Sequence, residues 1–290
     1  MQRELIRAIA TLRKGGPESL ERALLYLQRT VFSFSLKLCG NRADAEDTAQ
    51  ETLLRVVDYL AHFDTPEALA VWLYKTAKSR CLMSRRRSKY APAALMSVEG
   101  ASLDPPDGRS ATAAAAETPE VALAHREELH LLHEAILKLP STYRVVLVLH
   151  DMEGLSAAET GQVLGLTEGA VRVRLHRARL LLRQELNQPG TLADGVMPIS
   201  SRCRELARQL SECLDHRLAD TLVEELARHL HNCTPCRELL ADLEQSVERC
   251  RQNRTSPESI NRDTTPRTLL LKQYQQVLAR IRESANARHR

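Results

Sequence analysis

The sequence predicts an all-α protein built from several small helical domains that linkers join. Aromatic residues make up only 3% of the 290 residues, whereas Leu, Ala, Arg and Glu are abundant. This mixture is typical of small helical domains with Leu/Ala cores. Apolar residues recur at helical spacing, and no segment has the alternating pattern that would indicate a strand. A chain of this length has room for two or three domains.

The first block, residues 1–90, is predicted to be a helical bundle. An amphipathic N-terminal helix precedes a helix that starts near Pro17 and stops at Gly40–Asn41. The next helix carries one apolar stripe, and a further helix begins near Pro66. Residues 91–117 are rich in Ala, Ser, Pro, Asp and Gly without a sustained period, so we expect a flexible linker there.

Three further segments complete the expected organisation. Residues 118–188 contain a long helix (120–139), a break at Pro140, a short helix, and two helices separated by "GLT". Residues 189–199 are predicted to be a second linker, and residues 200–253 a helical block that holds most of the remaining cysteines. A tail, residues 254–290, contains one amphipathic helix.

The pattern in residues 155–186 is typical of a helix-turn-helix. Ser156 and Glu159 have capping-box spacing, Gly165 suits a tight turn, and Thr167 can cap the second helix. On that helix Val171, Leu175 and Ala178 are expected to face inward, whereas the basic side chains point elsewhere: Arg172, Arg174, His176, Arg177 and Arg179. A helix that enters the DNA major groove needs this division, although a solvated basic helix of another bundle stays the alternative.

Charge is divided unevenly in the first block. No acidic residue lies between Glu67 and Glu99, and the basic residues there are interleaved with Trp72, Tyr74 and Tyr90. Such a surface suits a nucleic-acid backbone and unstacked bases. The preceding helix begins with Asp44, Glu46, Asp47 and Glu51; by itself this cluster indicates only favourable interaction with a helix dipole.

Several classes of protein are disfavoured by the sequence. No apolar run approaches the roughly 18 residues that span a membrane, and the N-terminus lacks the apolar centre of a signal peptide, so we expect a cytoplasmic protein without membrane insertion. Seven cysteines, an odd number, argue against a disulfide framework in that compartment. Common catalytic motifs are absent, so we do not expect an enzyme.

A candidate metal site lies late in the chain, in "HLHNCTPC". The spacing His229-x3-Cys233-x2-Cys236 places three ligands at one helix end, and Cys203 on the preceding predicted helix is the expected fourth. Leucines that recur every four residues would pack the two helices together: Leu206, Leu210, Leu214, Leu218, Leu222, Leu226 and Leu230. Cys213, His216 and His231 are competing ligands, and a metal-free buried thiol cluster is the alternative. Cys39, Cys81 and Cys250 are expected to be core residues or bystanders.

Three segments occur in order across the first linker: "DAEDTAQETLLRV" (44–56), "WLYKTAKSRCLMSRRR" (72–87) and "LPSTYRVVLVLHDMEGLSAAETGQVLGLTEGAVRVRLHRAR" (139–179). Together they resemble the extracytoplasmic-function (ECF) group of the sigma-70 family. The resemblance implies a region 2-like bundle that binds core RNA polymerase and melts the minus-ten element, and a region 4-like domain that reads the minus-thirty-five element.

The resemblance also implies roles for particular residues. The polymerase would be bound by Asp44, Glu46, Asp47, Gln50 and Glu51. The melted promoter strand would be bound by Trp72, Lys75, Lys78, Arg80, Arg85 and Arg86. The upstream element would be bound by Arg172, Arg174, His176 and Arg177. The chain departs from the family's usual pattern at Thr76, Ser79 and Met83, which bears on promoter preference more than on polymerase contact.

The third block resembles the zinc-binding anti-sigma domain, which usually forms a separate protein that clasps a sigma factor. "CRELARQLSECLDHRLADTLVEELARHLHNCTPCREL" follows its order of ligands, with His216 in place of a usual Gly. The resemblance implies a Zn²⁺ ion on Cys203, His229, Cys233 and Cys236. We hypothesise that this block regulates the sigma factor in cis; a zinc-stapled domain that recruits another partner is the alternative. The runner-up function for the whole chain is a helix-turn-helix regulator that is not a polymerase subunit.

Overall fold

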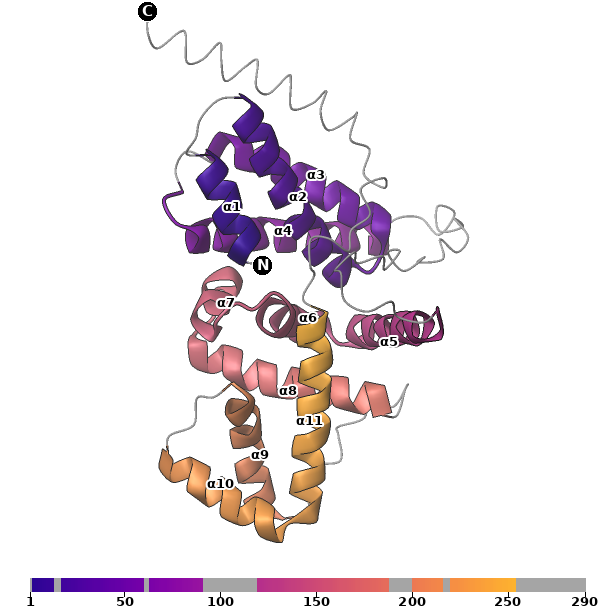
Figure 1. Ribbon diagram of the computed structural model, residues 1–290, viewed down its shortest axis with the longest axis vertical. Coiled ribbons are helices and arrows are strands. Elements are labelled where there is room, and N and C mark those ends of the chain that lie inside the picture. Colours follow the sequence, from indigo (N-terminus) through magenta and orange to yellow (C-terminus); the bar gives the residue numbers. More distant parts are fainter. Residues whose placement is uncertain are drawn as a thin grey trace, which may run out of the picture. The chain divides into compact units, whose positions relative to one another are not determined.

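The computed structural model describes residues 2–12, 17–59, 63–90, 119–187, 200–215 and 220–253 (Figure 1). These residues contain helices and no strand, which confirms the all-α prediction. They fall in two compact units, with α1–α4 in unit 1 and α5–α11 in unit 2. The expected linkers (91–117 and 189–199) and the expected tail helix lie outside the described residues.

Unit 1 is a bundle of α1 (Gln2–Leu12), α2 (Pro17–Cys39), α3 (Arg42–Tyr59) and α4 (Pro66–Tyr90). The helix α2 packs against each of the other three helices. Apolar side chains from all four helices form the core: Leu5, Leu24, Leu27, Phe34, Leu53, Leu69 and Leu73. The predicted stop after α2 is confirmed, because Gly40 takes a φ of 84° that favours glycine.

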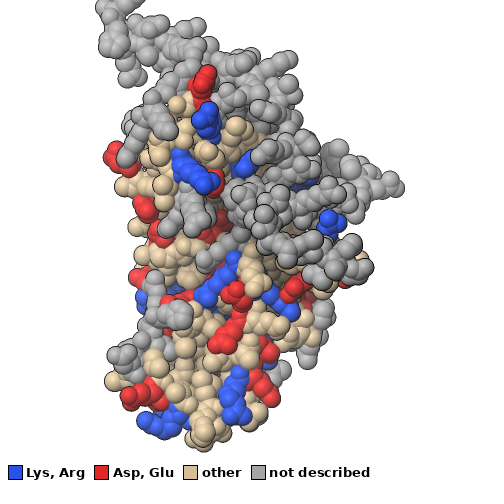
Figure 2. Space-filling model, viewed as in Figure 1, with Lys and Arg blue, Asp and Glu red and all other residues tan. Residues whose placement is uncertain are grey.

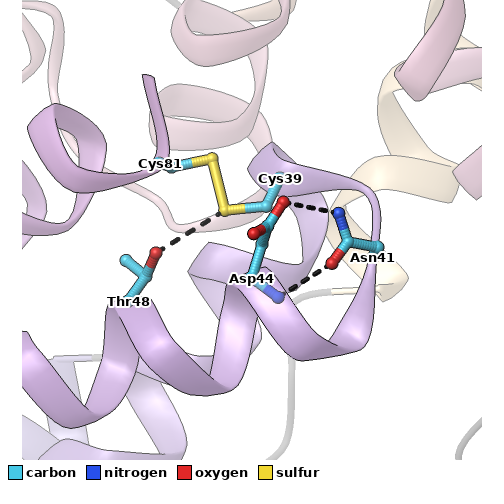
Figure 3. The surroundings of a disulfide bond; sticks show 5 residues. All are labelled: Cys39, Asn41, Asp44, Thr48 and Cys81. Atoms are coloured by element: carbon cyan, nitrogen blue, oxygen red, sulfur yellow. Dashed lines mark hydrogen bonds between the residues drawn. A yellow bond between two sulfur atoms is a disulfide. The ribbon is translucent and has the colours of Figure 1, made fainter. Parts of the chain in front are cut away.

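A disulfide joins the end of α2 to the middle of α4 in unit 1 (Figure 3). Cys39 and Cys81 are buried, as expected of core residues, but their Cα atoms lie 5.6 Å apart and their sulfur atoms are bonded. The expectation of no disulfide came from the cellular compartment, whereas the pairing follows from how α2 packs against α4. Thr48 on α3 lies beside this bond, with 3.9 Å between its Oγ1 and Sγ of Cys39.

The first half of unit 2 consists of α5 (Pro119–Lys138), α6 (Ser141–Leu147), a π-helical turn η3 (Val148–Met152), α7 (Ala157–Leu164) and α8 (Glu168–Asn187). The predicted break at Pro140 is stabilised by the buried side chain of Arg144. Its Nε donates to the carbonyl of Ile136 at 3.1 Å, and its Nη2 donates to the carbonyl of Leu139 at 3.0 Å. These bonds add partners to carbonyls at the end of α5, where the residue four positions after Ile136 is Pro140 and has no N–H to donate.

The second half of unit 2 consists of α9 (Ser201–Leu214), α10 (Asp220–Asn232) and α11 (Thr234–Gln252). We refer to residues 200–253 as the C-terminal block. Four of the predicted leucines lie in its core, with three side chains from α11 that the sequence pattern did not include: Leu206, Leu210, Leu214, Leu226, Leu239, Leu243 and Val247. Leu230 packs partly buried against this core, Leu222 is only partly buried, and Leu218 lies outside the described residues.

The C-terminal block packs on the first half of unit 2, because α9 and α11 both contact α8 (Figure 1). Leu180 of α8 packs against the leucine core of the block. On the face visible in Figure 2, acidic and basic side chains of unit 2 are interspersed. No helix in the described ranges has the length and apolar character that a membrane crossing requires.

Candidate functional site

The acidic residues expected to bind polymerase all lie on the first half of α3. Asn41 caps this helix: its Oδ1 accepts from the backbone N–H of Asp44 at 2.8 Å, and its Nδ2 donates to the Asp44 carboxylate at 2.7 Å (Figure 3). Asp47 is exposed, whereas Asp44, Glu46, Gln50 and Glu51 are partly exposed. The helix therefore presents carboxylates at its N-terminal end, where the helix dipole stabilises negative charge.

An ion pair connects this acidic helix with the basic helix α4. The carboxylate of Glu51 contacts the guanidinium of Arg80, whose side chain is only 19% exposed. Glu51 also lies 3.7 Å from Arg55 on its own helix. The two sets of residues, expected to bind polymerase and promoter respectively, thus meet at Glu51 and Arg80.

The basic and aromatic residues of α4 divide into three groups. Trp72 lies in an aromatic cluster, with ring centroids 5.5 Å from Tyr59 and 5.9 Å from Phe63. Lys75 is exposed, and Lys78 is partly buried; burial, and then the charge of Lys75, lowers the pKa of Lys78. Arg85 and Arg86 lie on the last turns of α4, where the side chains fall outside the described part of the chain.

The helix-turn-helix has the local geometry that its sequence predicts. The hydroxyl of Ser156 accepts from the N–H of Glu159 at 3.1 Å, and the Glu159 carboxylate accepts from the N–H of Ser156 at 2.7 Å. Gly165 ends α7 with a φ of 69°. Thr167 caps α8 through a 3.3 Å bond from the N–H of Ala170 to its hydroxyl. These features confirm the capping box, the turn and the second cap.

Some basic side chains of α8 are exposed, and others are covered. The inward-facing residues Val171, Leu175 and Ala178 are buried as predicted. Arg172 and Arg177 are exposed, and Arg174 is partly exposed. Arg172 pairs with Glu168 one turn earlier. We call Arg172, Arg174 and Arg177 the open arginines.

His176 does not lie on the exposed face where the sequence pattern placed it. Its side chain is 7% exposed, and its Nδ1 has no hydrogen-bond partner in the described part of the chain. Burial, followed by the charges of Arg208, Arg179 and Arg177, lowers the pKa of His176 to about 4. Because Arg208 belongs to α9, His176 lies on the side of α8 that faces the C-terminal block. The imidazole is therefore neutral near pH 7.

Arg179 is the largest fully buried side chain of the described residues, with 0% exposure. Its Nε and Nη2 donate to the Asp151 carboxylate at 2.9 and 2.6 Å, within the first half of unit 2. Its Nη1 and Nη2 donate to Asp215 at 3.2 and 2.8 Å, and its Nη1 donates to the hydroxyl of Ser211 at 2.9 Å. A buried charge is stable only when paired in this way.

The ionisation of this network follows from its geometry. Burial alone would raise the pKa of Asp151, but the charge and hydrogen bonds of Arg179 outweigh burial and hold that pKa well below its usual range. Burial would likewise lower the pKa of Arg179, and the two carboxylates raise it instead. Both groups are therefore charged at neutral pH. The side chains of His150, Asp151 and Asp215 also lie close enough together to hold a metal ion. The Arg179 guanidinium already supplies the positive charge beside these carboxylates.

The four side chains expected to bind metal come together at one end of the C-terminal block. Their ligand atoms all lie within 4.8 Å of one another. Sγ of Cys203 is 3.7 Å from Nε2 of His229 and 3.9 Å from Sγ of Cys233, and Nε2 of His229 is 3.2 Å from Sγ of Cys236. We call these four residues the thiol–imidazole cluster. Cys213 and His231 lie outside it, and His216 lies outside the described residues.

The cluster has dimensions and chemistry that fit a zinc ion. Zn–S and Zn–N bonds of about 2.0–2.3 Å in a tetrahedron separate neighbouring ligand atoms by about 3.3–3.8 Å, close to the separations here. Burial, and then the neighbouring thiols Cys233 and Cys203, raises the pKa of Cys236 to about 12. A bond from the hydroxyl of Ser200, the N-cap of α9, lowers the pKa of Cys203 despite its burial. A cation would stabilise all three thiolates together.

Several structurally important residues were missed by reasoning from sequence. Gly161 in α7 lies so close to the next turn that an added Cβ would be 2.6 Å from the carbonyl oxygen of Leu166. A glycine inside an amphipathic helix is a signal of such close approach. The pairing of Asp151 with Arg179 and the capping by Arg144 have no local signal, because each depends on helices that meet only in the folded chain.

Comparison with known proteins assigns two segments of the chain to a family. Residues 24–90 match the family model of sigma-70 region 2, and residues 129–182 match that of sigma-70, region 4. The first match runs from within α2 to the end of α4, and the second from within α5 to Leu182 of α8. Neither match extends into the C-terminal block.

The chain is also similar to whole sigma factors. It is 29% identical over 189 residues to the ECF RNA polymerase sigma factor SigW of Bacillus subtilis, covering 64% of this chain and 98% of that protein. It is 30% identical over 161 residues to the ECF RNA polymerase sigma factor SigL of Mycobacterium tuberculosis, covering 55% of this chain and 84% of that protein.

A further relative, the ECF RNA polymerase sigma factor SigE of Mycolicibacterium smegmatis, is 35% identical over 158 residues. That alignment covers 54% of this chain and 57% of the relative, so this chain spans little more than half of it. Two family models in the expected order, together with the nearly full-length match to SigW and the 84% coverage of SigL, favour a polymerase subunit over a free-standing helix-turn-helix regulator. The chain belongs to the ECF group of the sigma-70 family of RNA polymerase sigma factors.

Proposed function

We propose that the C-terminal block is a zinc-binding domain that regulates this ECF sigma factor in cis. The observation that carries the proposal is the convergence of Cys203, His229, Cys233 and Cys236 in a block that packs on α8. Four protein ligands leave no open position on a tetrahedral ion, so the zinc has a structural or regulatory role rather than a catalytic one.

The rest of the chain acts, in this proposal, through three surfaces. The acidic first half of α3 (Asp44, Glu46, Asp47, Gln50 and Glu51) binds core RNA polymerase, and the basic helix α4 binds the melted promoter strand. The open arginines of α8 bind the upstream promoter element, where arginines suit phosphates and base edges. A sigma factor acts where RNA polymerase is, so the proposal places the chain in the cytoplasm.

The C-terminal block lowers promoter binding because it covers the stripe of α8 that runs from Arg172 through His176 and Arg179, and it leaves only the start of that stripe exposed. His176, an expected DNA contact, is buried on that side. Fusion to the sigma domains gives the block an effective concentration of about a millimolar, so modest contacts suffice for regulation. Thiolate ligands make loss of metal or oxidation the signal that releases the block.

Run-off transcription tests this proposal. Core polymerase is combined with the full chain or with a chain that ends at residue 190, on promoter fragments that the shorter chain selects from genomic DNA. We expect the shorter chain to give about tenfold more transcript, and the full chain to gain activity after zinc chelation. Zinc analysis of the purified full chain should give about one ion per molecule. Equal transcript yields under all metal and redox conditions would rule out regulation in cis and leave recruitment of another partner as the role of the block.

A further inference from the structure

The covered flank of α8 carries the contacts that fasten the C-terminal block to the helix-turn-helix. We call His176, Arg179, Leu180 and Arg183 the docking flank. Arg179 is central to it because its guanidinium binds acceptors in the first half of unit 2 and acceptors in the C-terminal block. Among the described residues, Nε bonds only to Asp151 of η3, whereas Nη1 bonds only to Ser211 of α9 and to Asp215, the C-cap of α9. Without the C-terminal block, Nη1 would lose all of these acceptors.

Further contacts hold the C-terminal block against the rest of unit 2. Leu180 packs against the leucine core of the block. One turn further along α8, Arg183 donates to Asp242 of α11 at 2.8 Å, and Asn187 donates to the same carboxylate at 3.3 Å. Near the C-terminal end of α11, Arg249 pairs with Glu128 of α5 at 2.9 Å. Polar contacts thus surround an apolar one, as in protein interfaces generally.

The helix α9 connects the docking flank with the thiol–imidazole cluster. Cys203 lies in its first turn, and Ser211 and Asp215 lie at its other end. At about 1.5 Å per residue, these ends are roughly 18 Å apart. The end near Asp215 is held by Arg251 of α11, which donates to the carbonyl of Leu214 at 3.0 Å. Both ends of α9 are therefore tied to α11, one through the cluster and the other through Arg251.

We propose that Arg179 is the residue that positions the C-terminal block on α8, and that α9 makes this docking depend on the thiol–imidazole cluster. When the cluster is intact, α9 is held against α10 and α11, so Ser211 and Asp215 meet the Arg179 guanidinium. When the cluster is broken, α9 is no longer fixed at the Cys203 end, and Asp215 loses its position. The coupling to the cluster rests on the proposed zinc site; the docking contact itself does not.

The test compares Asp215→Ala with the matched control Glu244→Gln in the full, zinc-loaded chain. Asp215 is chosen because its loss leaves the pair between Asp151 of η3 and Arg179 of α8 intact. Glu244 is an exposed carboxylate on α11. The readouts are zinc content, which reports whether the block is folded, and hydrogen exchange of the backbone amides of residues 176–187, which reports docking.

We expect Asp215→Ala to keep its zinc and to raise exchange at residues 176–187 by about tenfold or more, since a hydrogen bond between charged groups is lost. Glu244→Gln should match the parent chain. Chelation should raise exchange in the parent chain at least as far as Asp215→Ala does, because it also releases the contacts of Leu180 and Arg183 with the block. Unchanged exchange in a zinc-loaded Asp215→Ala chain would overturn the role of Arg179, and unchanged exchange on chelation of the parent would overturn the coupling.

A second variant keeps the test decisive if Asp215→Ala loses its zinc. Asp242→Ala removes the contact with Arg183 at a more exposed position, and we expect a smaller rise in exchange with full zinc content; no rise would count against the docking flank. Transcription separates this inference from the proposed function. If exchange rises while transcript yield stays the same, docking through Arg179 stands and regulation in cis fails.

Discussion

The two units of this sigma factor differ in how far their expected binding surfaces are exposed. In unit 1, the acidic half of α3 and Lys75 of α4 are at least partly exposed, and a disulfide and an apolar core stabilise the bundle beneath them. In unit 2, the chain's own C-terminal block covers one flank of α8 through Arg179 and Leu180. Among the described residues, the covered surface is therefore the one on the helix-turn-helix.

The largest effect that separates the units is expected from loss of the thiol–imidazole cluster. Cys236→Ser, or chelation of the parent chain, should reduce bound zinc to near zero and unfold α9–α11, since structural zinc contributes on the order of 10 kcal/mol to small domains. Zinc analysis and circular dichroism measure this outcome. Cys213→Ser is the control, because Cys213 lies outside the cluster. Full zinc binding by Cys236→Ser would contradict the ligand set.

A smaller effect, confined to unit 1, is expected from the disulfide. Cys39→Ala should lower the free energy of unfolding of unit 1 by about 4 kcal/mol, because the bond closes a long loop between residues 42 positions apart. Thermal unfolding followed by hydrogen exchange of α2 and α4 measures the change. Adding Cys81→Ala should cost little more, since either substitution alone breaks the bond. Fully additive costs would show that the two cysteines act independently.

A smaller loss of stability is expected from a substitution next to the turn of the helix-turn-helix. Gly161→Ala should destabilise unit 2 by about 1–3 kcal/mol, because the new Cβ would approach the Leu166 carbonyl, a backbone atom that cannot move freely. Chemical denaturation monitors the change. Gly169→Ala is the matched control, because an added Cβ there meets nothing within 4 Å. Equal stability of the two variants would mean that α7 and the turn are packed less closely than the structure indicates.

The free energy of unfolding of unit 2 should fall at acid pH because of His176. The pKa of His176 is about 4 in the folded chain against an ordinary value of 6.5, so the unfolded state binds more protons between these values. Stability therefore falls as pH falls from about 6.5 to 4, by about 2 kcal/mol between pH 7 and 5.

Unfolding titrations at several pH values measure this dependence. His176→Gln lacks the titrating group but keeps the zinc ligands, so the difference between its profile and that of the parent isolates the contribution of His176. Parallel profiles would show that His176 is not buried as the structure places it.

Local signals in the sequence predicted much of both units. Ser156, Glu159 and Gly165 fix the helix-turn-helix because each acts on residues within one turn. The thiol–imidazole cluster was also foreseen, since ligand spacing and leucine periodicity act along single helices. The burial of His176 and the sharing of Arg179 were not, because both depend on where α9 and α11 pack. The Cys39–Cys81 pairing likewise follows from the packing of α2 on α4 rather than from any spacing.

The central claim, that the C-terminal block restrains promoter binding by unit 2, is tested most directly by DNA affinity. Fluorescence anisotropy at one fixed salt concentration compares the full chain, the Asp215→Ala chain and a chain ending at residue 190 on a duplex of the upstream promoter element. We predict that the shortened chain binds about tenfold more tightly than the zinc-loaded full chain, and that Asp215→Ala, which keeps the rest of the block, moves in the same direction. Equal affinity of all three chains would contradict the account.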